Sequence, residues 1–260
     1  RLLIMERSIF GMSLFNLIAV AGISLAVLFA GGSRVSAEVE TSGNFTYVSQ
    51  YIWRGWDLAP DSEPALQGGI SVAHPSGVSL DVWGSYAIDD DSQLDELDYT
   101  IGYATMISDT AELSFGYTLY TFPSLTEGGG AAQSESREAF AGLAFPDVFL
   151  GPSLTLYHDW EDGDGTYIFL GLGYDVEFTE SGAPPLCLSL GAGYNSGQWG
   201  SATTTGRDEK GISDIDLGAS MTFTAGSVDI TPSLNYIITP MDEINDDNEF
   251  FVGLDFGFSL

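Results

Sequence analysis

The chain has 260 residues and a formal net charge of −30, with 37 Asp and Glu against 7 Lys and Arg. So large an excess of acid argues strongly against a nucleic-acid-binding protein, because such proteins neutralise phosphates with basic side chains. A hydrophobic content of 44% excludes a disordered chain, and 32 Gly with 13% aromatic residues are typical of a chain with many strands and turns.

Residues 1–37 have the pattern of a cleaved signal peptide. Arg7 precedes an uncharged apolar run from about Leu14 to Ala30, and Val35-Ser36-Ala37 supplies small residues where a signal peptidase needs them. The mature chain is therefore expected to begin near Glu38. The alternative is a retained helix, since the apolar run reaches the short end of a membrane-spanning segment.

Residues 38–260 are expected to form a single all-β domain of about twelve strands, because apolar and polar residues alternate with a period of two between turn signals. The expected strands are 43–53, 65–73, 78–87, 94–106, 110–121, 135–145, 152–159, 166–177, 186–198, 211–224, 228–239 and 249–260. The last strand shows the pattern most clearly. On one parity it carries Phe250, Val252, Leu254, Phe256, Phe258 and Leu260, and on the other Phe251, Gly253, Asp255, Gly257 and Ser259.

The connections between these strands alternate in length. Mostly longer, acidic loops follow the odd-numbered strands, as in Trp56–Pro64 and Pro240–Asn248, and mostly short turns follow the even-numbered ones, as in Ala225-Gly226-Ser227. Long loops at one end and short turns at the other are typical of antiparallel up-and-down barrels in the bacterial outer membrane. A soluble β-sandwich also explains the alternation, but it leaves the signal segment and the loop asymmetry unconnected.

Acidic side chains keep to the polar face of the expected strands. A charge on the lipid face near the membrane midplane would cost about 2–4 kcal/mol for a base and less for an acid, whereas a water-filled lumen tolerates either. The expected pore-lining acids are Asp81, Glu112, Asp175, Glu177, Asp214, Asp216, Asp229 and Asp255. Between low-dielectric walls they would attract cations and disfavour anions. The alternative is a solvated face with no role in selectivity.

Arg54 is also expected to line the pore, at the end of the first strand. There it could pair with Asp81 or Asp255 on neighbouring strands, either as a structural ion pair or as a charge that orders ions at the constriction. A barrel of twelve strands is intermediate in width between eight-stranded barrels, which side chains fill, and porins of 16–18 strands, which hold an open channel. Large inward-facing aromatic residues would narrow the pore further, or plug it, at Trp83, Tyr120, Tyr157, Phe169 and Phe251.

The beginning of the mature chain resembles a known family. The residues concerned are Tyr51-Ile52-Trp53-Arg54-Gly55, Pro64-Ala65-Leu66-Gln67-Gly68-Gly69, Ser76-Gly77 and Trp83. In order and spacing this series is similar to that of the TorF-type porins, small Gram-negative outer-membrane barrels. The resemblance implies an outer-membrane location and a pore role. For an outer-membrane barrel, the expected partners are outer-membrane lipid, lipopolysaccharide and the assembly machinery. Leu260 departs from the terminal aromatic residue more usual for recognition by that machinery.

Catalysis, a metal site and a cofactor are not expected. His74 and His158 are the two histidines, and no Gly-x-Ser-x-Gly elbow or metal-spaced histidine cluster accompanies them. The acidic loops 161–165 and 242–249 lack EF-hand spacing. Five aromatic residues near the long-loop end are expected to form an interfacial girdle: Trp53, Trp56, Trp160, Tyr194 and Trp199.

The sequence thus predicts an outer-membrane, porin-like channel for passive diffusion of ions or small solutes, with a preference for cations. The competing hypothesis is a non-conducting structural or adhesive barrel with acidic surface loops. What separates the two is whether the lumen is open.

Overall fold

The computed structural model describes residues 39–58, 63–88, 94–123, 135–178, 182–199 and 210–260. These residues belong to one compact unit, Glu38–Leu260. The signal segment expected at 1–37 lies outside them and stays a prediction. Within the described ranges there is no helix of the length and apolar character that crossing a membrane would need.

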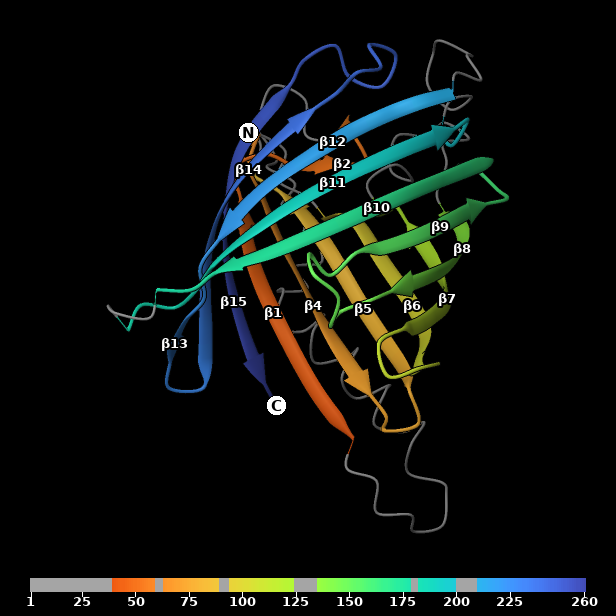
Figure 1. Ribbon diagram of the computed structural model, residues 1–260. Coiled ribbons are helices and arrows are strands. Elements are labelled where there is room, and N and C mark those ends of the chain that lie inside the picture. The colour runs from red at the N-terminus through yellow and green to blue at the C-terminus, as the bar shows by residue number, and fades with distance from the viewer. Residues whose placement is uncertain (1–38, 59–62, 89–93, 124–134, 179–181, 200–209) are drawn as a thin grey trace, which may run out of the picture. The chain divides into compact units, whose positions relative to one another are not determined.

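A closed antiparallel sheet forms the body of this unit (Figure 1). Its strands are β1 (Glu40–Val48), β4 (Ala65–Ala73), β5 (Val78–Ala87), β6 (Leu94–Met106), β7 (Glu112–Thr121), β8 (Glu135–Ala144), β9 (Ser153–Asp159), β10 (Gly165–Val176), β11 (Leu186–Ser196), β12 (Lys210–Ser220), β13 (Phe223–Ala225), β14 (Val228–Ile238) and β15 (Glu249–Ser259). A separate two-stranded sheet contains β2 (Ile52–Trp53) and β3 (Trp56–Asp57).

The sheet closes because the two ends of the chain pair with each other. β1 pairs with β15 from Ser42 opposite Ser259 to Val48 opposite Gly253. Every other wall strand pairs with its neighbours along the chain, and β14 receives both β12 and β13. Since β12 and β13 act as one interrupted strand, the wall has twelve strands. The predicted all-β, up-and-down, twelve-stranded barrel is confirmed.

The expected strands agree with the observed ones except in two places. The strand expected at 43–53 leaves the wall after Val48, and the chain then folds into the β2–β3 hairpin. The strand expected at 211–224 is interrupted at Met221 and Thr222, which lie opposite Pro232 and Thr231 of β14. Pro232 has no N–H to donate to the ladder, which weakens the pairing at this point.

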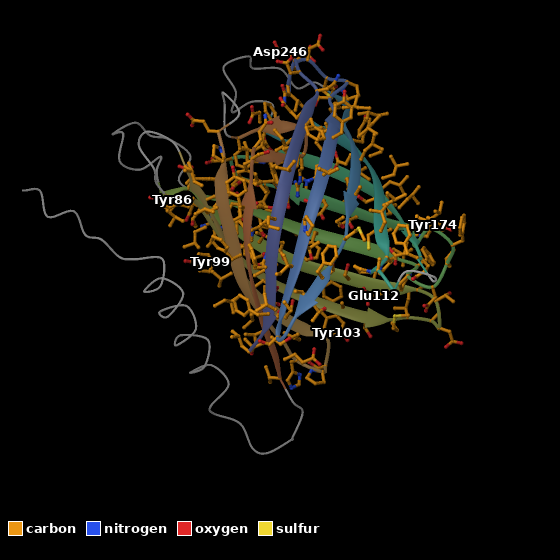
Figure 2. All side chains as sticks on the ribbon, turned by 90° about the vertical axis from the view of Figure 1, so that its left-hand side faces the viewer. Tyr86, Tyr99, Tyr103, Glu112, Tyr174 and Asp246 are labelled. Carbon is orange, nitrogen blue, oxygen red and sulfur yellow. The ribbon has the colours of Figure 1, made fainter. Side chains whose placement is uncertain are left out.

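The two faces of the wall differ as the alternation predicts. Large apolar residues on the outward parity remain exposed in the isolated barrel, such as Leu234 at 54% and Phe250 at 62%. Tyr99 and Tyr174 project from the outside of the wall in Figure 2. The inward parity carries small, polar and acidic residues, including the fully buried Asp214. An apolar exterior around a polar lumen places this protein in the bacterial outer membrane.

Glycines on the inward parity make room for inward-pointing rings. A Cβ on Gly116 would lie 2.4 Å from the ring of Phe140, and one on Gly191 would lie 2.4 Å from the ring of Phe169. Both distances are too short for a real contact, so a side chain at either position would force an aromatic ring to move. Large rings on the lumen face are therefore set against bare backbone at these positions.

A matched pair of substitutions in β14 tests which face meets lipid. Leu234→Lys places a charge on the outward face and should lower the free energy of unfolding by about 2–4 kcal/mol. Asn235→Lys, one residue further along, places the same charge in the lumen and should cost clearly less. Equilibrium unfolding in urea, in lipid vesicles, measures both, and equal losses would contradict the assignment of faces.

Candidate functional site

The candidate site lies inside one end of the barrel. We call this the long-loop end: it is the end where β1, β5, β7, β9, β11 and β14 finish. The opposite end, where β4, β6, β8, β10, β13 and β15 finish, is the short-turn end. Buried polar side chains gather at the long-loop end, among them Gln50, Ser85, Glu96, Ser136, Glu138, Asp159, Asn195, Gln198, Ser213 and Asp214.

The β2–β3 hairpin is at the centre of this cluster. Its two-residue turn consists of Arg54 (φ 52°) and Gly55 (φ 85°), and a type I′ hairpin turn needs a positive φ at both positions. Gly55 also leaves little room for a side chain, because a Cβ there would lie 3.0 Å from the carbonyl oxygen of Ser213. For Arg54 a positive φ is a strained conformation, which persists only where other contacts hold it.

The hairpin crosses the lumen. Near its start, Gln50 donates to Glu249 of β15 (2.8 Å), and Tyr51 donates to Glu96 of β6 (2.8 Å). At its tip, Arg54 reaches Glu138 of β8 and the ring of Tyr157 of β9. By the order of pairing, β9 is six strands from β1 in either direction. The hairpin thus leaves the wall at β1 and ends against the opposite side.

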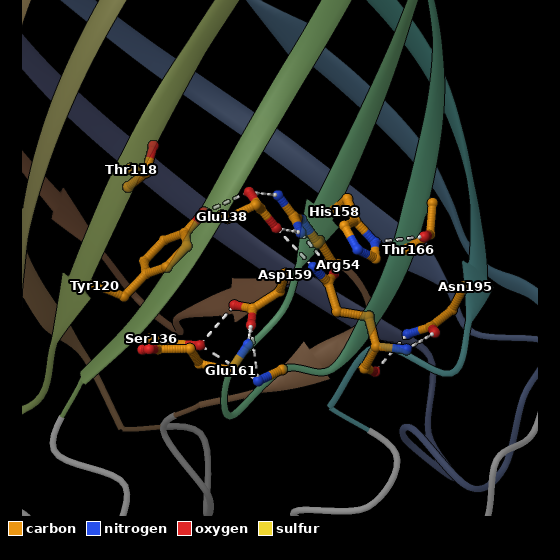
Figure 3. Close-up of polar contacts among 12 residues, drawn as sticks. Arg54, Thr118, Tyr120, Ser136, Glu138, His158, Asp159, Glu161, Thr166 and Asn195 are labelled. Atoms are coloured by element: carbon orange, nitrogen blue, oxygen red, sulfur yellow. Dashed lines mark hydrogen bonds and ion pairs between the residues drawn. The ribbon is translucent and has the colours of Figure 1, made fainter.

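Arg54 and Glu138 form a buried, two-pronged ion pair (Figure 3). The Nη1 and Nη2 atoms of Arg54 donate to the two carboxylate oxygens of Glu138 at 2.6 and 2.9 Å. The arginine side chain is 9% exposed and the glutamate side chain 1%. Burial by itself disfavours the cation, but the hydrogen bond and the charge of Glu138 outweigh it and raise the pKa of Arg54. Arg54 therefore stays charged.

Neutral groups complete the surroundings of this pair. Glu138 also accepts hydrogen bonds from the hydroxyl of Tyr120 (2.8 Å) and the amide of Gln198 (2.6 Å). Arg54 donates to the side-chain oxygen of Gln198 at 2.6 Å. Its Cζ lies 4.2 Å from the ring centre of Tyr157, 4.6 Å from that of Tyr167 and 4.3 Å from that of Trp53. The guanidinium is thus held by a carboxylate, an amide and three aromatic faces.

Two further loops fold inward and support the cluster. Asp159 accepts hydrogen bonds from Ser136 (2.6 Å) and from the backbone N–H groups of Glu161 (2.8 Å) and Gly163 (3.1 Å), which fixes the loop after β9 (Figure 3). Near the end of β11, Asn195 exchanges hydrogen bonds with the backbone of Gln198 at 2.8 and 3.0 Å. This turn carries the Gln198 side chain into the lumen beside Arg54.

The predicted partner of Arg54 is wrong. Arg54 pairs with Glu138, not with Asp81 or Asp255, because it belongs to the hairpin tip and not to the end of a wall strand. Asp255 instead accepts hydrogen bonds from Asn44 and Thr46 across the β1–β15 seam, at 3.0 and 2.5 Å. Asp81 accepts from Ser79 at 3.1 Å.

The predicted lumen acids divide between the two ends. Asp214 joins the cluster at the long-loop end, where it accepts from Tyr167 (2.8 Å) and Ser213 (2.5 Å), and the half-buried Asp216 follows it on β12. The others lie toward the short-turn end: Asp81, Glu112, Asp175, Glu177, Asp229 and Asp255. Figure 2 shows Glu112 far from Asp246, which lies in a loop of the long-loop end. Asp175, Glu177 and Asp229 are exposed there.

Several central residues were not predicted from the sequence, namely Glu138, Asp159, Tyr167 and Gln198. Glu138 lies on β8, where Ala139, Ala141 and Ala144 blur the apolar and polar parities. Gln198 lies beyond β11, in a loop whose inward turn no local pattern signals. Ser136, Glu138 and Phe140 do share one parity, and the partial alternation along β8 was the available signal.

The predicted aromatic girdle is partly wrong. Trp53 packs edge-on against Tyr120 at 6.0 Å and against Trp199 at 6.3 Å, and Trp199 also meets Phe122 at 6.0 Å. These tryptophans belong to the interior cluster, since the hairpin and the loop after β11 carry them inward. Trp160 fits the prediction: it is 47% exposed and lies 5.9 Å from Tyr117.

Removing the charge of Glu138 tests how much the buried Arg54–Glu138 ion pair stabilises the fold. Glu138→Gln leaves Arg54 buried and without its counter-charge, which should lower the free energy of unfolding by about 3–5 kcal/mol. The matched control is Glu135→Gln on the same strand, because the ion pair of Glu135 with Arg137 is exposed and screened by solvent. Equilibrium unfolding in urea measures both, and losses of the same size would contradict the central role of the Arg54–Glu138 pair.

Several solved outer-membrane proteins are similar to this chain. The NanC porin matches with a TM-score of 0.51 and 8% identity, over 85% of this chain and 100% of the porin chain. An outer-membrane channel from Pseudomonas putida F1 matches with a TM-score of 0.49 and 11% identity, over 88% of this chain and 100% of that chain. Outer membrane phospholipase A from Escherichia coli matches with a TM-score of 0.41 and 12% identity, over 89% of this chain and 95% of the phospholipase chain. At 8% identity, the likeness to the NanC porin concerns the fold alone, and it agrees with the closed barrel.

The sequence comparisons identify a family without an assigned activity. No curated protein matches the chain. A family model described as a bacterial protein of unknown function (Gcw_chp) matches residues 33–184, which include the hairpin, Glu138 and both Tyr157 and Tyr167. The chain therefore belongs to the Gcw_chp family of bacterial proteins.

Proposed function

We propose that this protein is a narrow outer-membrane channel for passive diffusion of small solutes, with a preference for cations, and that the β2–β3 hairpin sets its aperture. The observation that carries the proposal is the charge of the lumen. The lumen face carries acids at both ends of the barrel, and its base Arg54 is neutralised by Glu138. Of the other bases that the structure describes, Arg137 is paired with Glu135 and Glu161, and Lys210 is exposed at the start of β12.

An acidic lumen would act on permeating ions from both ends. Low-dielectric walls focus the field of charges that line a pore, which raises the local concentration of cations and lowers that of anions. At the short-turn end, the exposed acids Asp175 and Asp229 meet water directly. At the long-loop end, the buried acids Asp214 and Glu96 lie beside the hairpin. The resemblance of residues 51–83 to the TorF-type porins supports a pore role as well.

A closed barrel is the second candidate, and the hairpin favours it. Residues 50–57 contact side chains of β6, β8, β9 and β15 and place a charged plug across the lumen. If this plug never moves, the protein would be a structural or adhesive barrel that presents acidic loops on the cell surface. In either case we expect contacts with outer-membrane lipid and lipopolysaccharide, and insertion by the assembly machinery.

Catalysis is not part of the proposal. His74 hydrogen-bonds Ser76 within a short turn, at 2.8 Å. His158 lies 3.0 Å from Thr166 on an exposed part of the wall. The two histidines thus lie at separate places. Among the described residues, each ring has a hydrogen bond to a hydroxyl, and no carboxylate is described as hydrogen-bonded to either ring.

Conductance under a salt gradient tests the proposal. The protein, purified from outer membranes and inserted into a planar bilayer, should give steady current steps with a reversal potential of the cation-preferring sign. Replacing short-turn acids in the triple variant Asp81→Asn, Asp229→Asn, Asp255→Asn should move the reversal potential toward zero, because three lumen charges are lost. An inserted but silent barrel would favour the second candidate.

A loop variant is the matched control for selectivity. Asp246 is an exposed acid in the loop between β14 and β15, away from the short-turn acids (Figure 2). Asp246→Asn should leave the reversal potential nearly unchanged. If the triple variant has no more effect than Asp246→Asn, the short-turn acids do not select ions, and the preference for cations must be given up.

A further inference from the structure

The wall of the barrel contributes most of the contacts to the guanidinium of Arg54. Glu138 comes from β8, Tyr157 from β9, Tyr167 from β10 and Gln198 from the turn after β11. Of the groups described around Arg54, Trp53 is the one that the hairpin itself supplies. If the hairpin moved away, a carboxylate, an amide and two aromatic rings would therefore still surround the space that the guanidinium fills.

These wall groups are held in place by contacts that do not involve Arg54. Tyr120 donates to Glu138, and Gln198 donates to the same carboxylate. The backbone of Gln198 is fixed by Asn195. Tyr167 donates to Asp214 at 2.8 Å and lies 6.0 Å from Tyr157, ring centre to ring centre. Groups that need no rearrangement bind a ligand at lower entropic cost.

We propose that Glu138, Gln198, Tyr157 and Tyr167 form a receptor for guanidinium-bearing solutes, and that Arg54 is a tethered ligand occupying this receptor until a solute displaces it. The substrate class of the channel is then small guanidinium cations, so the passage of these solutes rests on the proposed channel function. Their binding to the wall does not rest on it.

The chemistry of the site favours guanidinium over ammonium. A planar guanidinium presents parallel N–H donors that match the two oxygens of a carboxylate, and its face stacks on aromatic rings. An ammonium ion has no such plane and is more strongly hydrated, so it would satisfy Glu138 less well and lose the stacking. Anions are disfavoured by Glu138 and by nearby Asp214.

The tether explains how such a site can serve a channel. A ligand on a short linker has an effective concentration of about millimolar or more at its own site, so a free solute must compete at a similar concentration. Binding in the intact protein is therefore weak and short-lived. Conduction requires this, because a site that holds a solute tightly blocks the pore.

The test uses the variant Arg54→Ala, which empties the receptor, with methylguanidinium and methylammonium as probes. Methylguanidinium at millimolar concentration should raise the melting temperature of the variant and reduce its single-channel conductance. Methylammonium at the same concentration should do neither. In the double variant with Glu138→Gln, the apparent affinity for methylguanidinium should fall at least tenfold. Wild-type protein should need a higher concentration for either effect.

Arg137→Ala is the matched control, since it removes an exposed arginine that pairs with Glu135 and Glu161 outside the cluster. It should behave as wild type toward both probes. If Arg54→Ala does not refold alone, methylguanidinium during refolding should restore it, and methylammonium should not. Equal responses to the two probes, or responses that persist without Glu138, would overturn the receptor.

The two readouts separate this inference from the channel function. A rise in melting temperature with methylguanidinium but no current in any variant would leave the receptor standing and overturn the channel. Current steps in Arg54→Ala that methylguanidinium does not reduce, together with an unchanged melting temperature, would overturn the receptor and leave the channel standing.

Discussion

The pairing of β1 with β15 is the constraint on which the rest of this structure depends. Backbone N–H and C=O groups in lipid have no water to bond with, so a membrane-spanning sheet must have no free edge. The seam from Ser42–Ser259 to Val48–Gly253 removes the last edge and fixes twelve strands around one lumen. Closure also decides which face meets lipid, so Leu234 and Phe250 lie outside and Asp214 lies inside.

Closure at twelve strands gives a barrel of intermediate width. Eight-stranded barrels are filled by their own inward residues, whereas barrels of 16–18 strands keep an aqueous channel. Here the space at the long-loop end is occupied by the β2–β3 hairpin, which begins immediately after the seam strand β1. The hairpin brings a base into an acidic interior, and the buried Arg54–Glu138 pair satisfies both charges.

The charge of the molecule has different consequences at the two ends of the barrel. Toward the short-turn end the acids are exposed or half-buried, so they act on ions through water. At the long-loop end Glu138, Asp159 and Asp214 are almost fully buried and satisfied by hydrogen bonds from named partners. Under the proposed function, the exposed acids toward the short-turn end and the buried cluster at the long-loop end would act on cations at different places along the lumen.

The sequence alone determined the fold class, the number of wall strands and the assignment of faces. These follow from local alternation, and alternation is visible wherever a strand has one lipid face and one lumen face, as in β15. The end of β1 was misplaced because Ile52 and Trp53 continue an extended pattern although the chain has left the wall. The tertiary structure decided where Arg54 goes and what it meets. Glu138, Tyr157, Tyr167 and Gln198 come from β8, β9, β10 and the turn after β11, and such partners are brought together only by closure of the barrel, which leaves no local signal in the sequence.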